Sequence, residues 1–218
     1  MDELTRLADK YGTDKGSVYH RYTSFYDEVL SPIKNDKLKF VEIGVWFGES
    51  IKMWRDYLPN STIYALDYVE SNATSKHSKG PGLKHAYNLD RVTPCIVDQS
   101  SRSDIARFVE LYGNSFDVIL DDGGHLMNQQ QISFGTFFPH VSPGGMYILE
   151  DLHTSLDHSK NFETSTIEVI RSLEKNNTVG VTAIYMTEEE IQYIEENVES
   201  VHLFSGNGSS WTSVIMKK

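Results

Sequence analysis

Short apolar runs separated by longer amphipathic segments constrain the fold of this 218-residue chain more than any other feature. Each run is rich in Val, Ile, Leu or aromatic residues and ends at a polar residue or a glycine, which is typical of buried strands. Strands that alternate with helices indicate an α/β fold with a mostly parallel sheet and helices on both faces. The expected strands are Phe40–Val45, Thr62–Leu66, Thr93–Val97, Phe116–Leu120 and Met146–Leu149, and the expected helices are Glu49–Tyr57, Ser103–Tyr112 and Leu126–Phe137.

The last third of the chain has a different pattern. Phe162–Lys175 and Thr187–Asn197 look helical, whereas Ser200–Phe204 and Trp211–Met216 look like strands. The short polar linker Ser205–Ser209 between them suits an antiparallel hairpin, so the expected sheet has seven strands and an antiparallel C-terminal strand. We expect one domain over residues 1–218, with an N-terminal lid or helical segment at 1–38 and a Rossmann-like core at 39–218.

Charge and composition exclude several classes of partner. The formal net charge of −11 would repel nucleic acid and anionic membranes. No apolar run approaches the ~20 residues of a membrane helix, and Met1–Lys10 lacks the apolar stretch of an export signal. Cys95 is the only cysteine, which excludes an internal disulfide and fits a reducing compartment. The expected protein is therefore soluble and cytoplasmic, with a possible homo-oligomeric state.

A glycine turn follows the first expected strand. The motif is Glu42-x-Gly44-x-x-x-Gly48 followed by Ser50, which differs from the Gly-x-Gly-x-x-Gly of dinucleotide-binding enzymes. Glycines at a strand-to-helix turn let the backbone approach a ligand closely. Asp67 ends the second strand, where an acid can accept hydrogen bonds from ribose hydroxyls, and Asp98 follows the third strand. Each of these residues taken alone can also be an ordinary turn glycine or helix cap.

Two acidic segments follow neighbouring expected strands. They are Asp121-Asp122-Gly-Gly-His125 and Glu150-Asp151. Because neighbouring strands lie ~4.8 Å apart, both segments can face one point at the carboxyl edge of the sheet. Carboxylates gathered there would repel one another, and a hard divalent cation such as Mg²⁺ or Mn²⁺ would relieve that repulsion. Helix capping and solvation are the alternative roles of such loop acids.

These motifs together resemble those of the metal-dependent sugar O-methyltransferases of the macrolide and tetracenomycin tailoring type. The resemblance runs from Tyr11 to about His153, and the matching pieces are Tyr11–Lys15, Glu42–Gly44, Asp121–His125 and Leu149–Leu152. It implies the class I methyltransferase fold, S-adenosylmethionine as methyl donor and a sugar or glycan hydroxyl as acceptor, with a deoxyhexose such as rhamnose favoured.

The resemblance also implies roles for single residues. Asp122, Glu150 and Asp151 match the metal ligands, and His125 matches the general base. An imidazole, with an ordinary pKa of ~6.5, can take a proton near neutral pH. The expected cofactor-binding residues are Thr13, Lys15, Glu42, Gly44, Gly48, Ser50, Asp67, Asp98 and Asp121. Lys15 is expected to meet the cofactor's carboxylate, with a lysine in solvent as the alternative.

Other functions stay open from the sequence. A catechol-type or other small-molecule O-methyltransferase would use a metal in the same way. Such an enzyme needs a lysine base, and no lysine closely follows Asp121-Asp122. A nicotinamide-dependent oxidoreductase on a similar sheet is disfavoured by the glycine spacing. A non-catalytic binding domain with the same fold is the third alternative.

Overall fold

The central element of the fold is one twisted seven-stranded sheet with the order β3-β2-β1-β4-β5-β7-β6. The computed structural model describes residues 1–68, 82–156, 165–181 and 183–218. All neighbouring strands pair in parallel except β7, which is antiparallel to both β5 and β6. The strands are β1 (Lys39–Ile43), β2 (Thr62–Asp67), β3 (Val92–Ile96), β4 (Phe116–Asp121), β5 (Val141–Leu149), β6 (Val198–Ser205) and β7 (Trp211–Lys217). The predicted sheet, including its C-terminal hairpin, is confirmed.

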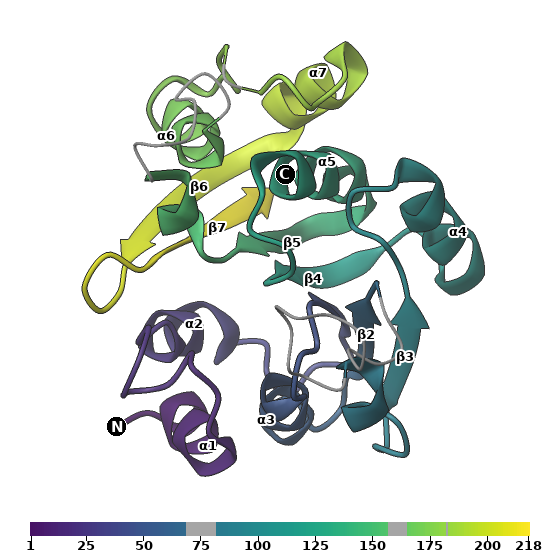
Figure 1. Cartoon of the computed structure of the whole chain (residues 1–218), viewed down its shortest axis with the longest axis vertical. Coiled ribbons are helices and arrows are strands. Elements are labelled where there is room, and N and C mark those ends of the chain that lie inside the picture. Colours follow the sequence, from purple (N-terminus) through teal and green to yellow (C-terminus); the bar gives the residue numbers. More distant parts are fainter. Residues whose placement is uncertain (69–81, 157–164, 182) are drawn as a thin grey trace.

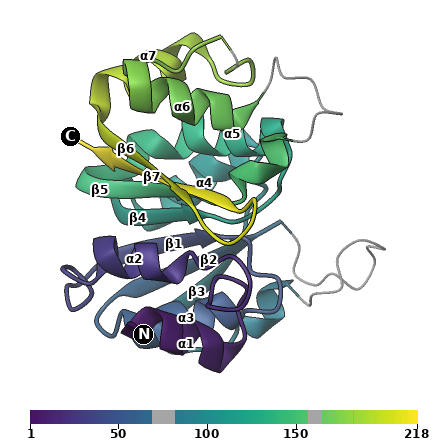
Figure 2. The same ribbon diagram turned by 90° about the vertical axis from the view of Figure 1, so that its left-hand side faces the viewer.

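Helices cover both faces of this sheet in separate layers (Figure 1). Figure 2 shows α1, α2 and α3 on one side and α5, α6 and α7 on the other. The helices are α1 (Glu3–Tyr11), α2 (Thr23–Leu30), α3 (Glu49–Tyr57), α4 (Arg102–Tyr112), α5 (Met127–Phe137), α6 (Thr166–Asn176) and α7 (Glu188–Asn197), with short 3₁₀ turns at Gly82–His85, Phe138–His140 and Leu152–Leu156.

The alternation of side chains along each strand produces two hydrophobic cores. In β4, Ile119 faces the core beneath α4 to α7, whereas Val118 and Leu120 face the core beneath α1 to α3. Trp54 of α3 packs in the second core against Phe40 of β1, with ring centroids 5.0 Å apart. The near-continuous apolar strands of the sequence are therefore explained by burial on both sides.

The N-terminal segment contains two helices that were not distinguished in the sequence. Asp2 caps α1 by accepting a hydrogen bond from the backbone N–H of Thr5, and Gly12 ends the helix in the left-handed conformation. Both helices pack into the second core rather than standing apart from it. Residues 1–38 therefore contribute directly to the body that holds the site.

Some element boundaries differ from the prediction. β5 begins at Val141 rather than Met146, because the strand continues through Pro143, Gly144 and Gly145. A register shift opposite Phe116–Val118 accommodates these residues. The predicted helix start at Phe162 lies outside the described residues, and α6 begins at Thr166. No helix of the described chain is long and apolar enough to cross a membrane.

Candidate active site

A cavity of about 1000 Å³ lies at the carboxyl ends of the parallel strands. This is the edge where ligands bind in open α/β sheets, and the volume suits a cofactor with part of an acceptor. The predicted site residues that line it are Thr13, Lys15, Gly44, Ser50, Asp67, Asp98, Asp122, His125 and Asp151. The other predicted residues, Glu42, Gly48, Asp121 and Glu150, lie behind this lining.

The glycine turn forms one end of the cavity. Gly44 has a φ of +95°, and a Cβ there would lie 2.1 Å from the carbonyl oxygen of Asp122, so only glycine fits. Gly48 is the left-handed residue that begins α3. Between them Trp46 also has a positive φ of 44° and is half exposed beside the cavity. A non-glycine residue in that conformation stores strain, which is typical of ligand-binding turns.

The acids beyond the strand ends have local hydrogen-bond partners. The Asp67 carboxylate accepts a hydrogen bond of 3.2 Å from the backbone N–H of Val45 in the glycine turn. Asp98 accepts bonds from the backbone N–H and the hydroxyl of Ser100, at 2.8 and 2.6 Å. These bonds hold both carboxylates at the cavity wall, where the sequence predicted cofactor contacts.

Asp121 supports the site from beneath. Its buried carboxylate accepts hydrogen bonds from Tyr147 at 2.8 Å and from the side-chain amide of Gln99 at 3.1 Å. Burial raises its pKa, against the effect of these bonds. Gln99 also accepts a hydrogen bond from the backbone N–H of Gly124, so the amide links Asp121 to the loop that carries His125. Because Asp121 does not line the cavity, the cofactor contact expected for it stays a prediction.

Glu42 is fully buried behind the glycine turn. One carboxylate oxygen accepts a 3.2 Å hydrogen bond from the indole N–H of Trp54. Burial raises the pKa of Glu42 to about 7, with the charge of Lys15 acting in the opposite direction. Because the side chain does not line the cavity, a direct contact of Glu42 with a cofactor stays a prediction.

Lys15 lies among the acidic residues at the carboxyl ends of β4 and β5. Its side chain is only 1% exposed, and its Nζ donates to Oδ2 of Asp122 and, at 2.9 Å, to Oε2 of Glu150. Register places these two acids next to each other, because Asp121 pairs with Leu149 at the ends of β4 and β5. The sequence predicted Lys15 at the cofactor's carboxylate, whereas the structure pairs it with two of the expected metal ligands.

Burial and the neighbouring charges shift the pKa values of the groups in this cluster. Burial raises the pKa of Asp122 to about 7, with Lys15 opposing and Asp151 adding to the shift. Burial also raises the pKa of Glu150 well above its ordinary range. Burial alone would lower the pKa of Lys15, but Asp122 and Glu150 reverse this and hold it well above its usual value. The two acids therefore favour the charged form of the lysine.

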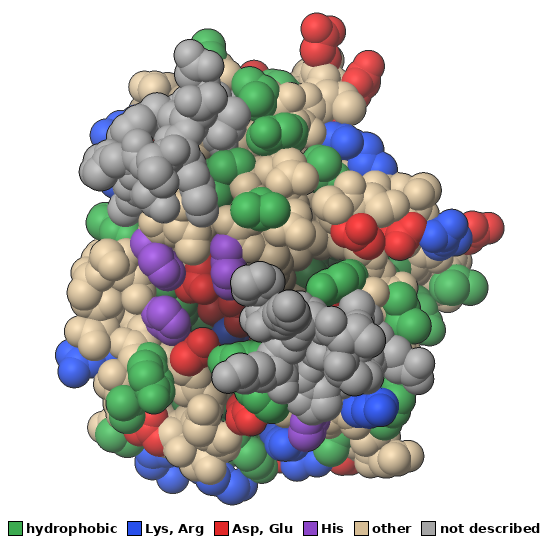
Figure 3. All heavy atoms as spheres, viewed as in Figure 1, with side chains coloured by type: hydrophobic (Ala, Val, Ile, Leu, Met, Phe, Trp, Pro, Cys, Tyr) green, Lys and Arg blue, Asp and Glu red, His purple; other side chains and the backbone are tan. Residues whose placement is uncertain are grey.

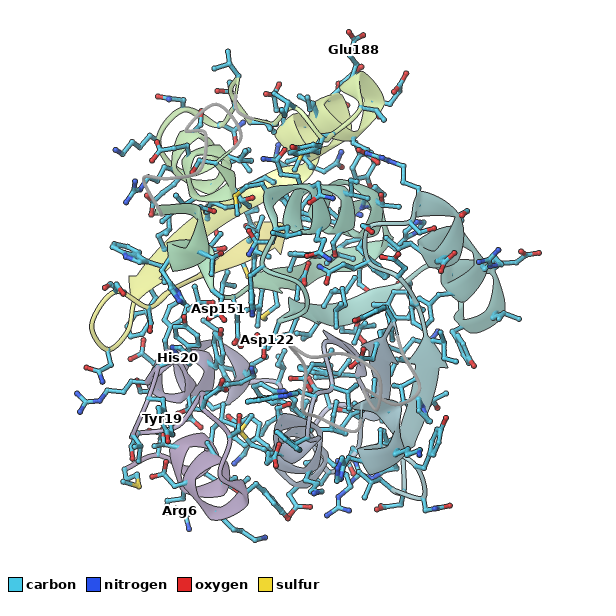
Figure 4. The ribbon with its side chains drawn as sticks, viewed as in Figure 1. Arg6, Tyr19, His20, Asp122, Asp151 and Glu188 are labelled. Carbon is cyan, nitrogen blue, oxygen red and sulfur yellow. The ribbon has the colours of Figure 1, made fainter. Side chains whose placement is uncertain are left out.

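Asp151 directs its carboxylate toward histidines. It has a positive φ of 54°, which is strained for a non-glycine residue. Nε2 of His125 lies 3.6 Å from Oδ2, and Nδ1 of His153 lies 3.9 Å from Oδ1. Figure 3 shows histidine side chains gathered around acidic ones on this face, and Figure 4 shows Asp122, Asp151 and His20 lying together between the sheet and the N-terminal helices.

Two tyrosines of the N-terminal segment, Tyr22 and Tyr26, complete the cluster, and Tyr26 was missed in the sequence. The Tyr22 hydroxyl donates to Oδ1 of Asp151 at 3.2 Å, and the Tyr26 hydroxyl donates to Oε1 of Glu150 at 3.0 Å. Their spacing of one helical turn was the available signal, because it places both rings on one face of α2. Within the described part of the chain, no group of three or more His, Cys, Asp or Glu side chains is arranged to hold a metal.

The comparisons with known proteins agree with this geometry. A family model described as a methyltransferase domain matches residues 41–152. Mycinamicin VI 2''-O-methyltransferase from Micromonospora griseorubida is 32% identical over 160 residues, which are 70% of this chain. Demethylmacrocin O-methyltransferase from Streptomyces fradiae is 30% identical over a segment of the same length. The chain belongs to the methyltransferase domain family.

A solved structure extends the likeness to almost the whole chain. The MycE methyltransferase of the mycinamycin biosynthetic pathway, in complex with Mg, SAH and mycinamycin VI, covers 99% of this chain with a TM-score of 0.77 and 24% identity. The predicted class I methyltransferase fold is thereby confirmed. The chain spans 37% of the length of the curated relatives and 54% of the MycE chain.

Proposed function

We propose that this protein is an S-adenosylmethionine-dependent O-methyltransferase that acts, with a divalent cation, on a sugar hydroxyl of a glycoside or glycan. Membership of the methyltransferase domain family supports the reaction class. The names of relatives that act on rhamnosyl-tetracenomycin-C and on L-olivosyl-oleandolide support the acceptor class, a deoxyhexose such as rhamnose. The observation that carries the proposal is one cavity with a glycine turn at one end and His125 beside clustered carboxylates at the other.

The cofactor end of the cavity fits S-adenosylmethionine. Gly44 lets the turn pack closely against the backbone of Asp122, and the residues of this turn line the cavity. The Asp67 carboxylate lies at the cavity wall at the end of β2, a position that suits a contact with ribose hydroxyls. Asp98 and Ser100 form the neighbouring wall, where the adenine end is expected. These residues bind and orient the donor without any covalent step.

The acidic end offers carboxylate ligands that support a hard divalent cation there once the Lys15 ammonium has left. Oxygens of Asp122 and Glu150 already converge on one cationic nitrogen, so the two strand ends can share a single positive charge. With Asp151 beside them the donor set is entirely carboxylate, which favours Mg²⁺ or Mn²⁺. When bound, the donor supplies the methyl group and the cation lowers the pKa of the acceptor hydroxyl.

His125 is the proposed general base. Its side chain is 48% exposed at the cavity and lies beside Asp151, which can orient the imidazole and stabilise its protonated form. Lys15 also lies beside the acids and would be the base of a catechol-type mechanism. In the structure its ammonium is buried against Asp122 and Glu150, whereas the His125 imidazole is exposed at the cavity, so His125 is the better placed of the two.

Methyl transfer from radiolabelled S-adenosylmethionine to a panel of rhamnosides and other deoxyhexosides, with Mg²⁺, tests the proposal. We expect label to appear in at least one glycoside, and we expect EDTA to abolish this incorporation. Transfer to catechols but not to glycosides would replace the acceptor class. Absence of binding to S-adenosylhomocysteine would contradict the methyltransferase assignment.

A further inference from the structure

The Lys15 ammonium occupies the point on which the carboxylates of Asp122 and Glu150 converge. We infer that Lys15 is a built-in counter-ion of the proposed metal site, and that a divalent cation bound by both carboxylates must displace it. The inference rests on the proposed function for the identity of the metal ligands. It adds a competition between two cations, one belonging to the chain and one from solution.

The balance of charge supports this role for Lys15. Asp122, Glu150 and Asp151 lie together, and Lys15 is the only Lys or Arg among the described residues that line the cavity. Buried carboxylates without a cation repel one another strongly. The lysine therefore stabilises the cluster until another cation replaces it.

Simultaneous occupation by both cations is unfavourable. Glu150 is 2% exposed, and its two oxygens are already engaged by Lys15 and the Tyr26 hydroxyl. A divalent cation on the same oxygens would face the ammonium at close range with little intervening water, where like charges repel most. Binding of the metal thus requires the ammonium to leave the Glu150 carboxylate.

An alternative position for the Lys15 ammonium lies beside Asp14. Lysine carries its charge on a flexible four-carbon stem, so the side chain can swing without unfolding the backbone. Asp14, which lines the cavity, already favours the charged lysine through its own charge. Movement toward Asp14 would bring the ammonium from the buried cluster into the cavity.

The first test is titration of the metal-stripped protein with Mn²⁺, followed by electron paramagnetic resonance, in the wild type and the Lys15→Met variant. The dissociation constant of Mn²⁺ is expected to fall at least about tenfold in the variant, because the competing cation is gone. Lys10→Met is the matched control, since Lys10 is exposed and pairs with Asp56 away from the cavity. Its affinity for Mn²⁺ should equal that of the wild type.

The second test uses the wild type alone and stands even if Lys15→Met fails to fold. Lysines are labelled by reductive methylation with and without saturating Mg²⁺, and Lys15 is compared with Lys10 by mass spectrometry. Lys15 is expected to be protected without the metal and labelled several-fold faster with it. Protection that persists in saturating Mg²⁺, or weaker Mn²⁺ binding by Lys15→Met, would overturn the inference. Titration with S-adenosylhomocysteine separates this failure from failure of the proposed function, because cofactor binding would persist.

Discussion

The two ends of the cavity are built in different ways. The glycine end uses residues from successive strand ends, and its contacts are with nearby backbone, such as Val45 to Asp67 and Ser100 to Asp98. The acidic end depends on partners far apart in the chain, such as Lys15 with Glu150 and Tyr22 with Asp151. The first end is a backbone cradle, and the second is a buried network of charges.

This difference determines how each end responds to change. Ligand binding at the glycine end is lost when added atoms obstruct the turn, because the shape of the backbone forms the binding surface. A buried charge network fails when one partner is removed, because the remaining charges lose their compensation. The predictions below separate these two kinds of failure, beginning with the largest expected effect.

Replacement of His125 by alanine should remove the proposed base at the acidic end. The rate of methyl transfer is expected to fall about 10²- to 10⁴-fold, the usual contribution of a general base. Affinity for S-adenosylhomocysteine should not change, because the glycine end is untouched. His202→Ala, an exposed position on β6, is the control and should retain full activity. An unaltered rate in His125→Ala would exclude this base.

Replacement of Gly44 by alanine should obstruct the cradle. The new Cβ would lie 2.1 Å from the carbonyl oxygen of Asp122, so we expect a loss of about 2–4 kcal/mol of unfolding free energy and of cofactor binding. Gly144→Ala has the same sign of φ, +75°, but no heavy atom within 4 Å, and should cost only about 1 kcal/mol. Equal losses in the two variants, measured by denaturant unfolding, would argue against the close approach.

Glu42 should make stability depend on pH. Its pKa of about 7 in the folded protein lies above the ordinary value of 4.5, so the folded state binds the extra proton. This contribution to stability is complete below pH 4.5 and is lost as pH rises through 7. Glu42→Gln should therefore reduce the fall in unfolding free energy between pH 5 and 8 by roughly 2 kcal/mol. Parallel curves for the two proteins would contradict the raised pKa.

Replacement of Tyr22 by phenylalanine should produce the smallest effect. The hydroxyl donates to Asp151 at 3.2 Å and lies 3.3 Å from the carbonyl oxygen of Trp211. Its loss is expected to cost about 1 kcal/mol of unfolding free energy. Tyr185→Phe, on the far side of the sheet from α2, should have no measurable effect on thermal unfolding. A Tyr22→Phe protein as stable as the wild type would show that the network does not need this donor.

The same contrast explains what the sequence could predict. Gly44, Asp67 and Asp122 follow apolar strands directly, so their common edge followed from the order of strands and helices. Lys15 joins Asp122 and Glu150 only through the packing of α1 and α2 on the sheet, and the Tyr11–Lys15 motif alone does not specify that partner. Tyr26 was missed for the same reason. The order of strands and helices along the chain predicts which residues lie at the carboxyl edge of the sheet. The partners of the charged side chains depend instead on how distant segments pack together.

Calorimetric titration of the metal-stripped protein with S-adenosylhomocysteine, and separately with Mg²⁺, tests the two-ended cavity most directly. It should include Asp67→Ala and the double variant Asp122→Ala/Glu150→Ala. We expect the wild type to bind both ligands, Asp67→Ala to lose affinity for the cofactor but not for Mg²⁺, and the double variant to show the reverse. Wild-type protein that binds no S-adenosylhomocysteine, or a double variant that binds Mg²⁺ as the wild type does, would contradict the account.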